Sequence, residues 1–166
     1  MKNSKGFTLI EILIVIAMLG ALAVALLATL DPIEQIRKSQ DAGVRNIVKE
    51  MSDGFNRYYA QTYAMPWSTT VIAWGTITTA NSSYISSVVK AGELKANFAD
   101  TAKNYYTKIY FASEANNTNM SVCFQPTSKS FKSDVNAMFG AGAANGTVAT
   151  IAGCGTSTST CFWCAR

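Results

Sequence analysis

The sequence predicts an α+β protein in which a long N-terminal α-helix packs against a small antiparallel β-sheet. Three observations predict it. The chain opens with a run of twenty-four residues, Phe7 to Leu30, that are apolar or small except for one acid. An amphipathic helical pattern follows to about Thr62, and the segments that we interpret as strands come after residue 100. Strand signals grouped after helix signals are typical of the α+β class.

The apolar run is long enough to cross a membrane. At about 1.5 Å per residue, a helix over this run spans roughly 36 Å, and the hydrocarbon core of a bilayer measures ~30 Å. Two cations, Lys2 and Lys5, precede the run, and its one acid is Glu11. A charged residue at the centre of a membrane helix costs about 2.5–3.5 kcal/mol. An ionisable residue inside such a segment indicates a functional site, which makes Glu11 the first candidate.

The segment Gly6-Phe7-Thr8-Leu9-Ile10-Glu11 resembles the class III signal of type IV pilins and of their relatives, the type II secretion pseudopilins and competence pilins. The resemblance is strong over about the first thirty residues. It implies a leader peptide, residues 1–6, that a membrane prepilin peptidase cuts off between Gly6 and Phe7. It also implies N-methylation of Phe7, a role for Glu11 as the acid needed for assembly, and a pilin-like fold.

The same resemblance implies the partners and the location. The precursor would cross the cytoplasmic membrane once, pass to the inner-membrane pilus assembly machinery, and polymerise with copies of itself into a cell-surface filament. Adhesion, motility or DNA uptake would be the work of that filament. Inside an apolar filament core, the Glu11 carboxylate and the Phe7 amine are each costly alone. We therefore expect the acid of one subunit to pair with the amine of the next.

Three alternatives stay open. A secretory signal peptide could be cut after Ala21-Leu22-Ala23 or Ala23-Val24-Ala25, but its apolar region of ~7–15 residues is shorter than this run and carries no acid. A membrane-anchored binding module that never polymerises has no use for Glu11. A type II secretion pseudopilin shares the motif, but such proteins often bind calcium through an acidic C-terminal loop. Asp134 is the only acid after residue 114.

The second half of the long helix, residues 31–62, begins where Asp31-Pro32 interrupts the apolar run. Proline suits the first turn of a helix, and Asp31 is a candidate N-cap, so the helix either restarts here or continues with a kink. The two halves together would give roughly 55 residues and about 80 Å of helix. Apolar residues then recur at spacings of mostly three and four, and this stripe predicts a packed face: Ile33, Ile36, Gly43, Val44, Ile47, Met51, Phe55 and Tyr58.

A charged row lies on the other side of this helix, at strict four-residue steps: Asp41, Arg45, Lys49, Asp53 and Arg57. Glu34 and Lys38 have the same spacing. Opposite charges four residues apart stabilise a helix by a few tenths of a kcal/mol. We interpret the row as a solvated helix face, with ion pairing between filament subunits as the alternative.

The remainder, residues 63–166, predicts one globular domain outside the membrane. Its first part is rich in Ser and Thr around Trp67 and Trp74, which we expect to pack in the domain and not to form a ligand platform. The segment Ser83–Gly92 predicts a short helix ended by its glycine. From about Ser133 to Thr160, small residues give weak propensity for any regular structure.

Strand signals lie in the middle of this domain. The segments Tyr105–Phe111 and Met120–Phe124 are aromatic and β-branched and predict strands. The segment Phe124–Phe131 predicts a hairpin with its turn at Pro126–Lys129. We expect three or four antiparallel strands laid across the amphipathic half of the long helix.

The four cysteines all lie beyond the membrane segment: Cys123, Cys154, Cys161 and Cys164. An even number on the oxidising side predicts two disulfides, with three possible connectivities. One bond should tie the tail to the strand that holds Cys123, because it closes the longer loop. A zinc site could use Cys161 and Cys164 as one half, but the other two cysteines lack the spacing of a second half. A redox pair would need a βαβ context, which the end of the chain does not offer. Similar pilins also close a C-terminal loop in this way, usually with one bond.

The composition argues against an enzyme. The sequence contains no histidine, which removes the commonest general base and the commonest metal ligand. It also lacks a glycine motif that would cradle phosphates. We therefore expect no catalytic residues, no metal and no cofactor. The formal net charge of +4 neither favours nor excludes nucleic acid as a partner.

Overall fold

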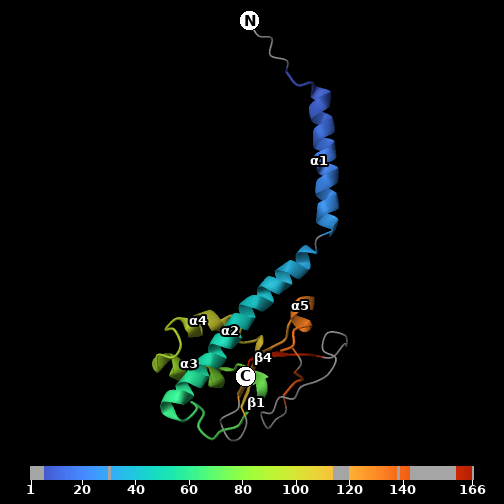
Figure 1. Ribbon diagram of the computed structural model, residues 1–166. Coiled ribbons are helices and arrows are strands. Elements are labelled where there is room, and N and C mark those ends of the chain that lie inside the picture. Colours follow the sequence, from blue (N-terminus) through green and yellow to red (C-terminus); the bar gives the residue numbers. More distant parts are fainter. Residues whose placement is uncertain (1–5, 30, 114–119, 138, 143–159, 166) are drawn as a thin grey trace. The chain divides into compact units, whose positions relative to one another are not determined.

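The structure is a computed structural model of the 166-residue chain, and it describes residues 6–29, 31–113, 120–137, 139–142 and 160–165. Figure 1 shows the order of its helices and strands. The chain separates into two compact units, Met1–Gln35 and Ile36–Arg166. The second unit therefore includes most of the amphipathic helix together with the globular domain.

The first unit contains helix α1, Leu9–Thr29. Thr8 caps its start, and the residues that follow are almost all Leu, Ile, Val, Ala and Met. Helix α1 is long and apolar enough to cross a membrane, as judged from its length and composition. None of its residues is buried. Because every side of the helix is apolar, it can be stable only with lipid or other protein around it.

Helix α2, Pro32–Thr62, begins as a new helix. Pro32 occupies the first helical position, where its missing N–H costs nothing. The Asp31 carboxylate accepts a hydrogen bond from the N–H of Glu34 at 3.2 Å, and the Asp31 carbonyl accepts one from the N–H of Gln35. The expected long helix is thus built from two helices of 21 and 31 residues, and Asp31 acts as the cap of the second.

The buried side of α2 faces the core of the second unit and consists of Asp41, Val44, Val48, Met51, Ser52, Gly54 and Phe55. The spacing of three and four residues places these on one face. The Phe55 ring stacks on Phe111 with centroids 5.6 Å apart and meets Trp67 edge-on at 5.1 Å. Ile33 and Ile36 belonged to the predicted stripe, but they are 59% and 58% exposed. The packed face therefore starts later than predicted, at Asp41.

The second unit contains a four-stranded antiparallel sheet in the order β1-β2-β3-β4, formed by Ile72–Thr76, Ile109–Ser113, Met120–Phe124 and Trp163–Ala165. Strands β2 and β3 pair along their whole length, and β1 joins β2 with a bulge. One face of the sheet contributes to the core that α2 covers, through Phe111, Val122 and Phe124 among others. The predicted α+β class, with an antiparallel sheet against the amphipathic helix, is confirmed.

Three short helices complete the second unit: α3 (Thr79–Lys90), α4 (Phe98–Lys103) and α5 (Lys129–Lys132). Helix α3 is the one predicted from the sequence. Its N-cap is Thr78, whose side chain accepts a hydrogen bond from the N–H of Asn81. Just after its end, Gly92 has φ of +83°, a conformation that residues with a side chain rarely adopt.

The loop after α3 packs closely against α2. A Cβ atom placed on Gly54 would lie 2.7 Å from Cγ of Leu94, which is only 4% exposed. Beside it, the Glu93 carboxylate accepts hydrogen bonds from Nε of Arg57 at 3.1 Å and from the side-chain amide of Gln61. The missing side chain of Gly54 is therefore what allows this loop to reach the helix.

We expect opposite effects from alanine at two glycines of α2. An Ala gains about 0.5–1 kcal/mol over Gly in a helix interior, but overpacking a buried contact costs about 1–3 kcal/mol. Gly54→Ala should therefore lower the free energy of unfolding, because Leu94 must move. Gly43→Ala should raise it, because nothing lies within 4 Å of the added Cβ. Urea unfolding followed by tryptophan fluorescence measures both variants, and a change of the same sign in both would contradict this account.

The strand predictions need two corrections. The segment Tyr105–Lys108 forms turns, and β2 begins only at Ile109. The predicted hairpin Phe124–Phe131 is wrong, because β3 pairs on that side with β4. The chain after Pro126 instead enters α5, where the Ser128 hydroxyl accepts a hydrogen bond from the N–H of Phe131. Strands β1 and β4 were not predicted at all.

Candidate processing and assembly site

Gly6 and Phe7 lie ahead of α1 in a non-helical segment of the first unit. Phe7 is 84% exposed, and a Cβ atom placed on Gly6 would have nothing within 4 Å beyond its chain neighbours. A protease that cuts between them would need an accessible backbone outside a helix. The predicted cleavage point lies in such a segment.

The Glu11 carboxylate folds back over the start of α1. Its Oε2 accepts hydrogen bonds from the N–H of Thr8 at 2.8 Å and from the Thr8 hydroxyl at 2.7 Å. In return, the Thr8 hydroxyl accepts a hydrogen bond from the N–H of Glu11 at 3.3 Å. This reciprocal arrangement is a capping box. The positive end of the helix dipole also favours a carboxylate at this place.

The capping box was not predicted, although its signal is present as Thr8-Leu9-Ile10-Glu11, a Thr followed three residues later by Glu. The box gives Glu11 a structural role at the start of α1. It also holds the carboxylate at the amide of Thr8, the residue that follows Phe7. Cleavage after Gly6 would therefore create a terminal amine one residue away from the point where Glu11 is bound.

A disulfide links the C-terminal strand of the second unit to its neighbour in the sheet. Cys123 of β3 and Cys164 of β4 lie opposite each other in the sheet and are bonded, so the tail is tied to the strand that carries Cys123. Cys161 is also disulfide-bonded, and Cys154 lies outside the described residues. Within the described ranges no group of three or more His, Cys, Asp or Glu side chains could hold a metal ion.

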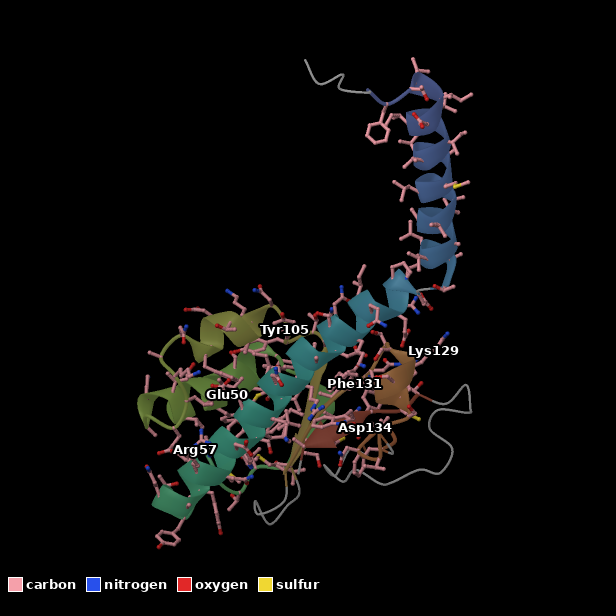
Figure 2. All side chains as sticks on the ribbon, turned by 45° about the horizontal axis from the view of Figure 1, so that its top comes forward. Glu50, Arg57, Tyr105, Lys129, Phe131 and Asp134 are labelled. Atoms are coloured by element: carbon pink, nitrogen blue, oxygen red, sulfur yellow. A yellow bond between two sulfur atoms is a disulfide. The ribbon has the colours of Figure 1, made fainter. Side chains whose placement is uncertain are left out.

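The charged row on α2 is only in part the solvated face that we expected, because Lys49, Asp53 and Arg57 are exposed but Asp41 and Arg45 are not. Asp41 is 3% exposed and accepts hydrogen bonds from Thr127 and Ser128. The Arg45 guanidinium lies 5.8 Å from the ring centroid of Phe131 and 5.6 Å from that of Trp163. Figure 2 marks Phe131 next to α2. Asp41 therefore binds the two residues before α5, and Arg45 contacts α5 and β4.

The ion pairs of α2 also differ from the expected ones. Arg57 binds Glu93 at 3.1 Å and Lys95 lies 3.9 Å from Glu50, and both pairs join the helix to the segment between α3 and α4. Among the described residues, no four-residue pair along the row meets the distance of a salt bridge. Arg57 and Glu50 of α2 therefore form ion pairs with residues of another segment and not with residues four positions away on the same helix.

Both tryptophans of the Ser- and Thr-rich stretch pack, as predicted. Trp67 is buried and contacts Phe55, Phe111 and Tyr84. Trp74 belongs to a second cluster beside the disulfide. It stacks on Tyr110 at 5.3 Å and meets Phe162 edge-on at 5.0 Å.

Comparison with known proteins identifies the N-terminal segment. Residues 1–27 match the family model of the prokaryotic N-terminal methylation motif, which is the class III prepilin signal of type IV pilins. Searches of curated proteins and of solved structures found no match to the chain. The motif supports a precursor of the type IV pilin or pseudopilin type, and it implies processing by prepilin peptidase and assembly into pilus-type filaments. Together with α1, it fits a membrane-anchored precursor.

Proposed function

We propose that the chain is the structural subunit of a type IV pilus-like surface filament. In this proposal the precursor is cut between Gly6 and Phe7, Phe7 is methylated, and mature subunits polymerise through α1. One observation carries it: α1 exposes apolar side chains all round, yet holds a single carboxylate, Glu11, at the end that bears the methylation motif. The subunit itself would do no chemistry. Adhesion, motility or DNA uptake would belong to the assembled filament.

The apolar surface of α1 is suited both to lipid, before assembly, and to the helices of other subunits, after assembly. In the membrane its apolar side chains contact hydrocarbon, so association gains little from the hydrophobic effect and depends on packing and polar contacts. Glu11 supplies such a polar contact. In the precursor, Thr8 satisfies one oxygen of its carboxylate. In a filament, the amine of a neighbouring Phe7 would neutralise the charge, which favours one register between subunits.

Two alternatives remain. A type II secretion pseudopilin has the same N-terminal motif. We favour the pilus because Asp134 is the only acid after residue 114, which leaves few carboxylates for a calcium-binding loop. A membrane-anchored surface module that never polymerises would need α1 but not the carboxylate within it.

The first test is mass spectrometry of the N-terminus on material sheared from native cells. We expect an abundant terminal peptide that begins with N-methylated Phe7. An N-terminus at Val24 or Leu26 would indicate an ordinary signal peptide, and an intact Met1 found only in membranes would indicate a plain anchor. Either result would contradict the proposal.

The second test separates the two roles of Glu11. Glu11→Ala should reduce the sheared filament fraction at least about tenfold, because the buried amine loses its counter-charge, a loss of several kcal/mol. Thr8→Val removes only the capping hydroxyl, worth about 1 kcal/mol, and should leave filaments abundant. Cleavage of both precursors, measured by mass, is the control. Wild-type filament levels in Glu11→Ala, or equal loss in both variants, would rule out the charge-pairing role.

A further inference from the structure

We propose that the groove between α3 and α4 binds a neutral saccharide. The groove has a volume of about 460 Å³ and opens to solvent on the surface of the second unit. Small-molecule sites typically measure ~300–1,000 Å³. Figure 1 shows the two helices next to each other. The proposal does not depend on the proposed function, because every residue that lines the groove belongs to the second unit.

The α3 side of the groove is a row of hydroxyl groups. The Ser82 hydroxyl donates to the Thr79 carbonyl at 2.7 Å, and the Ser86 hydroxyl donates to the Ser82 carbonyl at 3.2 Å. Because these protons are engaged, both serine oxygens present lone pairs to a ligand. The Thr78 oxygen accepts from the N–H of Asn81 at 3.4 Å, so its own proton can be donated. This side therefore offers both acceptors and a donor.

The α4 side supplies one charge of each sign. Asp100 and Lys103 are exposed, lie three residues apart on α4, and both line the groove. Their charges cancel, so the groove favours neither an anion nor a cation as a whole. The carboxylate is a strong acceptor for ligand hydroxyls, and the ammonium is a strong donor.

The base of the groove is less polar. It contains the buried side chain of Ile77 and the half-buried ring of Tyr106, whose hydroxyl donates to the Ala99 carbonyl at 3.4 Å. Burial raises the pKa of the Tyr106 phenol, and the Asp100 carboxylate raises it further. The phenol therefore stays protonated at neutral pH, and the charge of Asp100 acts within the groove.

These features together select a class of ligand. A pyranose ring has C–H faces that suit an aromatic ring, and each of its hydroxyls both donates and accepts. An apolar ligand would leave the hydroxyls and charges of the groove unpaired, which is costly. A multiply charged anion would meet the Asp100 carboxylate with only Lys103 to offset it. A neutral sugar can exchange hydrogen bonds with the hydroxyl groups and with both charges of the groove.

The test uses the full chain in a detergent without a sugar headgroup. Saturation-transfer NMR with the methyl glycosides of glucose, galactose, mannose and N-acetylglucosamine should show saturable binding of at least one. Asp100→Ala should weaken that binding about tenfold, as expected for the loss of a charge-assisted hydrogen bond. Ser86→Leu should abolish it, because the larger side chain fills the groove. Asp53→Ala, which changes an exposed acid on α2, is the matched control and should leave binding unchanged.

Three outcomes would overturn the proposal. One is the absence of saturable transfer to all four glycosides. Another is equal binding by wild type, Asp100→Ala and Ser86→Leu, with circular dichroism showing that both variants are folded. The last is preference for glucuronate over the neutral glycosides, because this would show that charge and not a neutral ring is recognised.

Discussion

Asp41→Ala is expected to lower the free energy of unfolding of the second unit by about 3 kcal/mol. The Asp41 carboxylate accepts from the N–H of Ser128 at 2.7 Å, the N–H of Thr127 at 3.0 Å and the Thr127 hydroxyl at 2.9 Å. Removing it leaves these donors without their acceptor at a place where Asp41 and Ser128 are buried. A buried donor left unsatisfied costs about 1–3 kcal/mol, and more where the lost partner was charged.

Urea unfolding with tryptophan fluorescence measures this loss. Asp41→Asn keeps one acceptor oxygen and should fall between wild type and the alanine variant. Asp53→Ala, on an exposed position of the same helix, should change the free energy by less than about 0.5 kcal/mol. Equal effects of the alanine substitutions at 41 and 53 would show that the hydrogen bonds to Thr127 and Ser128 do not contribute to stability.

Loss of the Cys123–Cys164 disulfide is expected to cost about 4 kcal/mol. The bonded residues are separated by 41 positions, and closing a loop of that size removes roughly this much conformational free energy from the unfolded chain. The variant Cys123→Ala/Cys164→Ala keeps small apolar side chains at two buried positions, so packing changes little. Its unfolding midpoint in urea should fall well below that of the oxidised wild type.

Reduction provides the control for this prediction. Wild-type protein unfolded in the presence of a thiol reductant should lose at least as much stability as the double variant, because Cys161 is also disulfide-bonded. If the free energy of unfolding of the double variant lay within about 1 kcal/mol of the wild-type value, the disulfide would not be what keeps β4 in the sheet.

The sequence predicted the elements that local pattern determines. Helix α3 and its end at Gly92 follow from a run of helix-compatible residues before a glycine, and β2 and β3 follow from aromatic and β-branched segments. The N-terminal motif was equally clear, because its residues are adjacent in the chain and match a known family model over residues 1–27.

The elements that depend on distant partners were missed. Strand β4 is three residues long and has no strong propensity of its own, and its pairing with β3 and the disulfide stabilise it. Strand β1 lies in a stretch rich in Ser and Thr, and among the strands that the structure describes it pairs with β2 alone. Asp41 belonged to a regular charged row, so nothing local showed that its partners would be Thr127 and Ser128, 86 and 87 residues away.

The place of β4 in the chain has a consequence for biosynthesis. The ribosome synthesises β3 before β4. During synthesis β3 can therefore pair with β2 but not yet with β4, and Cys123 cannot yet bond to Cys164. An open strand edge invites pairing with other chains. This edge of β3 can therefore close only after the chain has been made through residue 165. A copy that ended before β4 would have an unpaired strand edge and would lack Cys164, the partner of Cys123.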